Sequence, residues 1–275
     1  AAAGRRELTG HHHSTDAPTM PMNPRLLRPT ASGAAFTPAT LSGLVGWYDS
    51  ADLSSMAANS DGSGAVAVGD QVGYWADKSG SGNHVTQATA ANRPTLTAAA
   101  VNGKAALVFD GSNDNLFRTS YTAQSGLAGL TRIAVFSTSQ NSQMSRDLNG
   151  ADSAFFVNNA QLISRVTSNA GTASAIDPVN QLSVGVYSSV YDGSGPAMQL
   201  FVDNVLQAAE ASGLTPGSLP ATTPAGPGTL HIGSNAGANA FVAGPIAEYL
   251  VYARDLTAAE LTAAYDYLAA KWGLS

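Results

Sequence analysis

The alternation of apolar and polar positions is clearest in residues 102–117, NGKAALVFDGSNDNLF. Under the two-residue period of a strand, Leu107 and Phe109 point to one side, and Ala106 points to the other. The DGSND segment that follows supplies the Asp, Asn and Gly residues typical of tight turns, and an apolar Leu-Phe pair comes next. This pattern predicts a β-hairpin that another sheet covers on at least one face.

Short apolar runs of the same kind recur from Leu41 to the end of the chain, separated by turns rich in Gly, Asn and Ser. Many short strands with such turns are typical of a sandwich or a barrel. Residues 214–228 contain four prolines and are expected to form a surface loop, because proline is excluded from central strands. The predicted strands cover residues 44–49, 66–76, 105–110, 114–118, 130–138, 153–158, 161–167, 181–191, 197–203, 229–233 and 245–252.

One segment, residues 257–272, has helical periodicity. Thr257 and Glu260 have the spacing of a capping box, in which each side chain bonds to the backbone of the other residue. Gly273 lies where a helix C-cap favours glycine. The apolar face of this predicted helix consists of Leu261, Tyr265, Leu268 and Trp272. We expect the helix to close the sandwich.

Residues 1–40 contain five prolines and no alternation, so they are expected to form an extended N-terminal arm outside the core. Arms of this kind are commonly disordered tails. The alternative, which we favour, is a docking arm that contacts a partner subunit. The run His11-His12-His13 does not converge on one point in an extended chain, so we expect it to be solvated and not to bind a metal.

The arm is basic, whereas the rest of the chain is acidic. Four arginines against two acids give residues 1–40 a charge of +2, which leaves −8 for residues 41–275 within the total of −6. We therefore expect the arginines to make the docking contacts. They are Arg5, Arg6, Arg25 and Arg28.

The composition excludes several classes of protein. Charged residues make up only 12% of the chain, well below the usual quarter, and a surface of small polar residues suits contact with other subunits. A net charge of −6 argues against a nucleic-acid-binding surface. The absence of cysteine excludes disulfides, thiol catalysis and thiolate metal sites. No apolar run approaches the roughly 20 residues that cross a membrane.

Several motifs, in this order, resemble the concanavalin A-like lectin/glucanase superfamily in its laminin-G-like form. They are LVGWYDSADLSS at 44–55, YWADKSGSGNHVTQ at 74–87, NRPTL at 92–96, FDGSNDNL at 109–116, HIGSN at 231–235 and FVAGPIAEYLVYARDLTAAELTAAYDYLAAKWG at 241–273. The resemblance covers residues 41–275. It implies an all-β fold, a jelly-roll sandwich of two antiparallel sheets, with the extended arm before it and the helix at its end. Such domains are common in bacteriophage and bacterial surface proteins, and PMNPRLLRPTASG at 21–33 is similar to the leader of phage-encoded members.

Because the superfamily includes glycoside hydrolases, catalysis has to be considered. Retaining hydrolysis needs two carboxyl groups about 5–5.5 Å apart, and enzymes of this fold carry them at alternate positions of one strand. Of the four glutamates, Glu7 lies in the arm and Glu260 in the helix cap, and neither Glu210 nor Glu248 has a carboxylate two residues away. G-x-S-x-G, H-E-x-x-H and P-loop motifs are absent. We therefore expect no enzymatic activity and no catalytic residues.

Two sets of residues are weak candidates for ligand binding. Trp47, Tyr48, Trp75 and His84 could line a sugar-binding surface, although aromatic residues in strand-like runs belong more often to the core. Asp110 and Asp114 flank a turn and could offer carboxylates to Ca²⁺ as a cofactor. Capping of the turn amides is the favoured interpretation of this pair, and no metal site is expected.

Taken with the resemblance, these features favour a non-enzymatic phage virion structural protein, in capsid decoration or tail. The arm would bind other virion proteins, and a lectin-like domain would be displayed on the virion surface. The alternative is a carbohydrate-binding module or adhesin that recognises host-surface glycans. A glycoside hydrolase with an unusual acid/base pair is the least favoured hypothesis. We expect a homo-oligomer, as is usual for such proteins, with no nucleic-acid or membrane partner.

Overall fold

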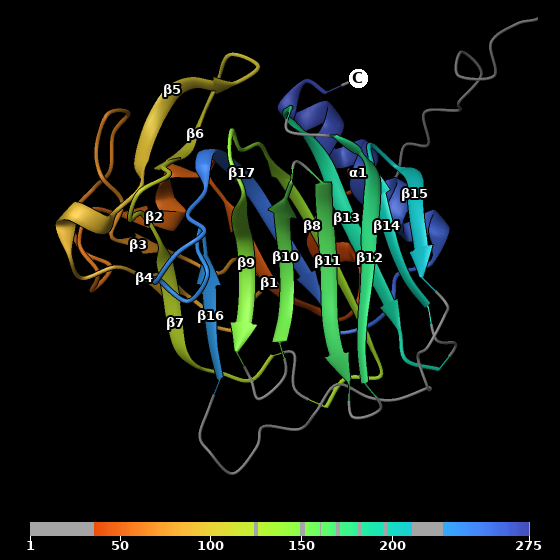
Figure 1. Ribbon diagram of the computed structural model, residues 1–275. Helices are drawn as coiled ribbons and strands as arrows, with labels where there is room; N and C mark the ends of the chain where they lie inside the picture. Colours follow the sequence, from red (N-terminus) through yellow and green to blue (C-terminus); the bar gives the residue numbers. More distant parts are fainter. Residues whose placement is uncertain are drawn as a thin grey trace, which may run out of the picture. The chain divides into compact units, whose positions relative to one another are not determined.

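Two antiparallel sheets pack face to face in the computed structural model, and one helix lies against them (Figure 1). The structure describes residues 36–123, 126–148, 152–159, 161–168, 171–180, 183–194, 197–210 and 228–274. The predicted all-β sandwich with a C-terminal helix is confirmed.

The first sheet has eight strands, in the order β15-β14-β13-β8-β17-β6-β5, with β1 also paired to β17. The first residues of β17 pair with β6 and its later residues with β1, while β8 occupies the opposite edge. The strands are β1 (Leu44–Asp49), β5 (Thr95–Val101), β6 (Lys104–Asp110), β8 (Gly129–Phe136), β13 (Gly185–Asp192), β14 (Ala197–Val202), β15 (Val205–Glu210) and β17 (Ala243–Tyr252).

The second sheet has nine strands, in the order β12-β11-β10-β9-β16-β7-β4-β3-β2. The short strands β2, β3 and β4 extend one side of it and are joined by long loops. The strands are β2 (Met56–Ala57), β3 (Tyr74–Trp75), β4 (Val85–Thr86), β7 (Leu116–Tyr121), β9 (Ser142–Leu148), β10 (Asp152–Asn158), β11 (Gln161–Ser168), β12 (Gly171–Asn180) and β16 (Gly228–Ile232).

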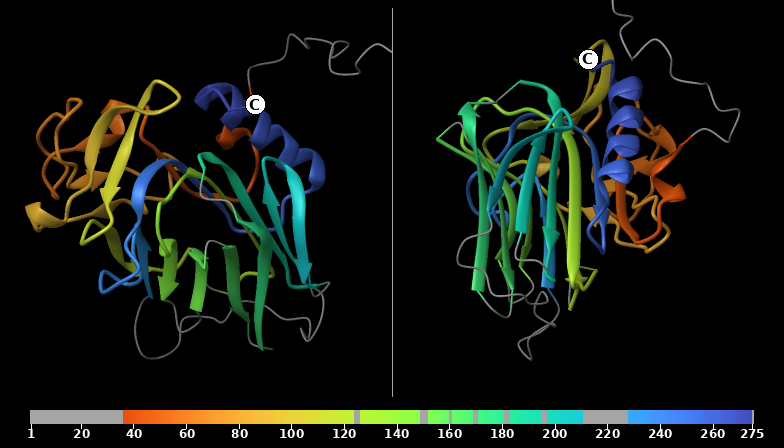
Figure 2. Two further views of the ribbon diagram at one scale, coloured as in Figure 1. Left: turned by 45° about the horizontal axis from the view of Figure 1, so that its top comes forward. Right: turned by 90° about the vertical axis from the view of Figure 1, so that its right-hand side faces the viewer.

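The two faces of the eight-stranded sheet bury different apolar clusters, as the two-residue period requires. Leu107 and Phe109 of β6 belong to the core between the two sheets. Ala106 belongs to a second cluster, between the sheet and the helix α1 (Ala258–Trp272). Figure 2 shows the three layers, with α1 on the outer side of the sandwich. The predicted alternation in β6 is therefore confirmed.

The helix forms as its local sequence predicts. Thr257 Oγ1 accepts from the Glu260 amide, and the Glu260 carboxylate accepts in return from the Thr257 amide at 2.9 Å. Gly273 adopts the left-handed conformation at the C-cap, with φ of 66°. Within the described residues, α1 is too short and too polar to span a bilayer, and no other helix qualifies.

The predicted hairpin at residues 102–117 is wrong. Strand β6 pairs with β5 and β17 in one sheet, whereas β7 pairs with β4 and β16 in the other. The turn at Asp110–Asp114 therefore carries the chain from one sheet to the other. The hairpin partner of β6 is instead the preceding strand β5, which is joined to it by the two-residue turn Asn102-Gly103.

Most other predicted strands are present within a few residues, with one clear exception. Residues 66–76 were predicted as a strand, yet only Tyr74–Trp75 pairs as β3, and an isolated bridge joins Gln71 to Thr95. Val66 and Val72 account for the apolar run: both side chains are buried in the core, although they lie in the loop between β2 and β3 and not in a strand. The sequence prediction missed six strands, which are β2, β4, β5, β9, β12 and β15.

The compact body of the fold begins earlier than the predicted boundary at Leu41. Phe36 packs against the helix-side cluster, and the carbonyl of buried Pro38 accepts a bond from Tyr252 Oη at 3.1 Å. Three 3₁₀ turns complete the described elements, at Pro38–Thr40, Leu53–Ser55 and Ala90–Asn92. The remaining arm, the four docking arginines and most of the 214–228 loop lie outside the described residues.

Candidate functional site

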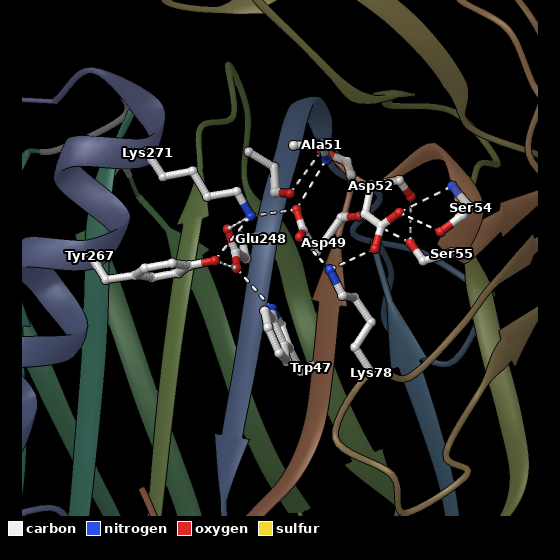
Figure 3. A network of polar contacts seen from close by, with 12 residues as sticks. Trp47, Asp49, Ala51, Asp52, Ser54, Ser55, Lys78, Glu248, Tyr267 and Lys271 are labelled. Carbon is white, nitrogen blue, oxygen red and sulfur yellow. Dashed lines mark hydrogen bonds and ion pairs between the residues drawn. The ribbon is translucent and has the colours of Figure 1, made fainter. Parts of the chain in front are cut away.

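Two constellations of polar side chains stand out, one buried and one open to solvent. The buried network lies between the eight-stranded sheet and α1 (Figure 3). Strand β1 contributes Trp47 and Asp49, which point to the helix side while Tyr48 between them points into the core. Asp49 faces Glu248 of β17 in the strand register, so two carboxylates meet across the sheet.

Two lysines connect these carboxylates. Lys271 of α1 places its Nζ 2.6 Å from Asp49 Oδ1 and 2.7 Å from Glu248 Oε2. Lys78 lies 2.8 Å from Asp49 Oδ2 and 2.7 Å from Asp52 Oδ2. Two ammonium groups therefore bridge three carboxylates, and the network fixes the last turn of α1 to the centre of the sheet (Figure 3).

Glu248 is the most deeply buried member, with 0% of the residue exposed. Besides Lys271, its oxygens accept bonds from Trp47 Nε1 and Trp272 Nε1, both at 2.8 Å. Burial, followed by the charge of Asp49, raises the pKa of Glu248, whereas Lys271 lowers it. The carboxylate oxygens already have donors and face no solvent, so the arrangement serves to hold the helix and not to exchange protons with a substrate.

Three of the predicted sugar-stacking residues therefore have other roles. Trp47 is a member of the network, and Lys78 covers its ring at 4.5 Å from the centroid. Tyr48 and Trp75 are wholly buried in the core, with ring centroids 5.7 Å apart, and Tyr48 donates to the Asn83 carbonyl at 2.5 Å. For Tyr48 and Trp75 the prediction as ligand contacts is wrong, because both lie in the core, as aromatic residues in strand-like runs do more often.

Asp110 and Asp114 cap the turn between the sheets. Asp110 Oδ1 accepts from the Ser112 amide at 2.8 Å, and Asp114 Oδ2 accepts from the Asp110 amide at 2.9 Å. The favoured interpretation as amide caps is confirmed. In the part of the chain that the structure describes, no three His, Asp or Glu side chains come together as metal ligands would.

Asp114 makes stability depend on pH. Burial raises its pKa from 3.8 to about 6. Between pH 3.8 and about 6, the Asp114 carboxyl is therefore protonated in the folded state and ionised in the unfolded chain. Its contribution to the free energy of unfolding is complete below pH 3.8 and is lost as the pH rises through about 6. We expect Asp114→Asn, which keeps an acceptor for the Asp110 amide, to remove this fall. The unfolding free energy of the variant should then rise more steeply with pH than that of the wild type in this window, because the lowered pKa of His231 acts in the opposite direction. Urea unfolding at several pH values measures it, and identical profiles for both proteins would contradict the assignment.

The open constellation is a surface pocket of about 300 Å³ on the nine-stranded sheet. Tyr74 of β3, Thr86 of β4 and Phe117 of β7 stand opposite one another in the strand register. Residues directly opposite on neighbouring strands point to the same face of a sheet, so the pairing aligns these three side chains. The lining residues are Tyr74, His84, Thr86, Phe117, Arg118 and Thr119.

The loop before β4 fixes His84 in this pocket. The carboxylate of Asp77 accepts from the backbone amides of Trp47, Ser79 and Asn83, at 2.8–2.9 Å, and so shapes the loop. The Asp77 amide in turn donates to His84 Nδ1 at 3.0 Å. Because Nδ1 accepts, the neutral ring carries its proton on Nε2, and this nitrogen is a donor.

Two aromatic rings flank the pocket. The centroid of the Tyr74 ring lies 5.3 Å from that of His84, and Phe117 stacks on His231 of β16 with centroids 5.6 Å apart. Burial, followed by the charge of Arg146, lowers the pKa of His231 to about 4, so this ring is neutral at neutral pH and supports Phe117 as an apolar neighbour. The pocket therefore combines aromatic faces, hydroxyl groups and an imidazole.

Of the predicted ligand residues, only His84 lines this pocket. Tyr74, Phe117 and Arg118 were missed because the pocket joins the segment that contains β3 and β4 to β7, which lies outside that segment in the sequence. One signal was present, since Tyr74 starts the YWADKSGSGNHVTQ motif that also holds His84. Nothing in that motif indicates that β7 lies beside it.

A second pocket contains neither of the buried carboxylates. It is apolar in character and borders the eight-stranded sheet, and its lining residues are Ser50, Ala51, Leu53, Val68, Lys104 and Ala105. The carboxylate pair of the buried network is therefore not exposed in either pocket.

No family model and no curated protein sequence matches this chain. Solved structures with a similar fold include the binding domain of Paraclostridial Mosquitocidal Protein 1, with a TM-score of 0.56, 9% identity, and coverage of 84% of this chain and 53% of that one. Trypanosoma rangeli sialidase in complex with the inhibitor DANA has a TM-score of 0.54 and 16% identity over 87% of this chain and 34% of that one. The botulinum neurotoxin serotype D binding domain has a TM-score of 0.52 and 8% identity over 82% and 51% of the two chains.

These similarities establish a lectin-like β-sandwich fold and nothing finer. The chain spans about half or less of the length of each of these structures. Two of them are binding domains and one is an enzyme, so the fold is compatible with either class.

Proposed function

We propose that this domain is a carbohydrate-binding module whose glycan site is the pocket between β3, β4 and β7. The observation that carries the proposal is the convergence of Tyr74 and Phe117 with His84 in an open pocket. Protein sites for small polar ligands combine apolar or aromatic walls with a few fixed polar groups. Aromatic faces fit the apolar side of a pyranose ring, and His84 with Thr86 and Thr119 offers hydrogen bonds to its hydroxyl groups.

The proposal is of binding without catalysis. The cross-strand pair of Asp49 and Glu248 is buried and engaged by lysines and indoles, which suits a structural role. None of the residues placed around the glycan pocket is an Asp or a Glu, so the pair of carboxyl groups that glycoside hydrolysis uses is missing from the site.

We expect Tyr74→Ala and Phe117→Ala each to weaken glycan binding by roughly 10-fold or more, because truncation of a central aromatic contact commonly costs over 1 kcal/mol. A glycan array that includes bacterial polysaccharides identifies the ligand, and titration calorimetry measures the loss. Tyr74→Phe keeps the ring and is expected to bind nearly as the wild type does. Phe241→Ala, a partly buried aromatic residue that does not line the pocket, is the control. Undiminished binding in both pocket variants would refute this site.

A second proposal concerns where the module works, and it rests on the sequence of the arm. We propose that the arm anchors the domain to capsid or tail subunits of a phage virion, with other copies of the chain beside it. The support is the proline-rich, basic composition of residues 1–40 against the acidic remainder. The full chain should co-sediment with particles that lack this protein, and replacement of the four arginines by glutamine should abolish co-sedimentation. If the quadruple variant still decorates particles fully, the anchor is elsewhere or the virion role is mistaken.

A further inference from the structure

His84 offers the glycan pocket a hydrogen-bond donor that the fold holds in one protonation state. Val85 points into the core, so the residues on either side of it, His84 and Thr86, point to the pocket face of the sheet under the two-residue period. His84 Nδ1 accepts from the Asp77 amide at 3.0 Å. Nε2 has no hydrogen-bond partner among the described residues and is not buried, so a ligand in the pocket can reach it.

The amide that bonds to His84 Nδ1 is fixed in place. The Asp77 carboxylate accepts from three backbone amides of the surrounding chain. The amides of residues 76 and 78, on either side of it, donate to the carbonyls of Ser55 and Trp47, both at 2.7 Å. The Asp77 amide therefore cannot turn away from His84 without breaking several other hydrogen bonds.

We propose that His84 makes the pocket acid-sensitive: a glycan binds while the ring is neutral and is released when the ring takes up a proton. The protonated ring carries a hydrogen on both nitrogens, so its Nδ1–H would face the Asp77 N–H with no acceptor between them. The ring then has to turn away from Tyr74, whose centroid lies 5.3 Å from its own, and the donor to the glycan is lost. This inference rests on the proposed function and adds its regulation by pH.

Few other charged or titratable groups face His84. On β3, burial followed by the charge of Asp77 raises the pKa of Tyr74 above 10.0, so its hydroxyl stays neutral. In the loop, the Asp77 carboxylate is engaged by its three amides. On β7, Arg118 lines the pocket but pairs with the core residue Leu230 in the strand register, so its side chain points to the other face of the sheet. Its charge does not change in the acid range.

Two more groups lie beyond these. His231 stacks behind Phe117, and burial lowers its pKa to about 4, so this ring is still neutral where ordinary histidines become charged. Lys78, in the same loop as His84, is held by two ion pairs in the buried network. Histidine side chains change charge between about pH 5 and 8, which leaves His84 as the group at the pocket that we expect to act in this range.

The test compares glycan binding by the full-length protein at about pH 8 and about pH 5, the ends of the range in which histidine side chains change charge. The probes are neutral disaccharides, which do not titrate themselves: lactose, maltose, cellobiose and chitobiose. By titration calorimetry we expect at least one to bind at the higher pH, with a dissociation constant roughly 10-fold or more higher at the lower pH. Long-range ¹H–¹⁵N correlation spectra should show the His84 proton on Nε2 at the higher pH, and a proton on Nδ1 there would overturn the proposal.

His84→Gln places a carboxamide, which still has an N–H donor but cannot titrate, where the imidazole was. This variant should bind the same disaccharide equally at both pH values. The matched control replaces His11, His12 and His13 with glutamine, which removes three histidines of the arm and should leave the pH dependence as in the wild type. Thermal melting at both pH values should show that all three proteins are folded.

Three outcomes would overturn the proposal. Equal wild-type binding at both pH values would leave the glycan site standing without the switch. A loss at low pH that persists in His84→Gln would assign the effect to another group; if that variant binds too weakly to measure, the pH midpoint of the wild-type loss has to match that of the His84 ring in the spectra. If the folded wild type binds none of the disaccharides, the acid-sensitive pocket is refuted, and the array decides separately whether any glycan binds.

Discussion

Replacing Lys271 with methionine is expected to lower the free energy of unfolding by about 3–5 kcal/mol, as is typical when one partner of a buried ion pair is removed. Lys271 is the only ammonium group in the described structure that contacts Glu248, and it also contacts Asp49. Without it, two buried carboxylates face each other across β1 and β17 with Lys78 as their sole cation. Chemical denaturation at neutral pH measures the change.

Lys104→Met is the matched control for this prediction. Lys104 is exposed and forms no ion pair within the described residues, so the same substitution there should change stability by about 0.5 kcal/mol or less. Adding Glu248→Gln to Lys271→Met should recover part of the loss, because the double variant has one buried charge fewer. A Lys271→Met protein as stable as the Lys104→Met protein would mean that the network does not hold the helix to the sheet.

Replacing Gly233 with alanine is expected to destabilise the fold by about 2–6 kcal/mol, through backbone strain and overpacking together. Gly233 follows β16 and has a φ of 90°, which side chains other than glycine rarely adopt. A Cβ there would lie 2.3 Å from Cε1 of Phe109, whose ring is buried between the sheets. The backbone cannot retreat easily, since Gly233 is hydrogen-bonded to Met144 and to Val242.

Gly80→Ala separates the two causes. Gly80 has a similar φ of 87°, but a Cβ there would meet nothing within 4 Å. That variant carries the strain alone and should cost about 1–2 kcal/mol. Combining Gly233→Ala with Phe109→Leu should cost less than the sum of the two single changes, because the smaller side chain leaves room for the methyl group. Equal losses in Gly233→Ala and Gly80→Ala would contradict the close approach of Phe109.

The parts of the fold that the sequence predicts are those decided by neighbouring residues. The helix follows from the capping box of Thr257 and Glu260, which lie within one turn. The caps at Asp110 and Asp114 likewise act within one turn of the chain. The pairing of β6 was mistaken on both sides. Its partner β5 precedes it through the two-residue turn Asn102-Gly103, a local signal that the prediction did not use, whereas its partner β17 is distant in the sequence and is chosen by long-range packing.

The contrast between neighbouring and distant residues also explains which residues of the candidate sites the sequence predicts. No predicted strand carries two carboxylates at alternate positions, whereas Asp49 and Glu248 form a pair across two strands. Trp47 and Glu248, which bond within this network, are 201 positions apart. His84 was found through its own motif, but Phe117 gives no signal of its own in the sequence. Only the register of β3, β4 and β7 shows that Tyr74, Thr86 and Phe117 lie side by side at the pocket.

We propose that a glycan occupies the pocket between β3, β4 and β7. Titration of the ¹⁵N-labelled protein with the tightest ligand from the glycan array tests this proposal, because it locates the amides whose resonances shift. We predict shifts concentrated at residues 74, 84–86 and 117–119, and their loss in Phe117→Ala. Shifts concentrated on another face, or around the apolar pocket at Ser50 and Leu53, would place the glycan elsewhere and contradict the claim.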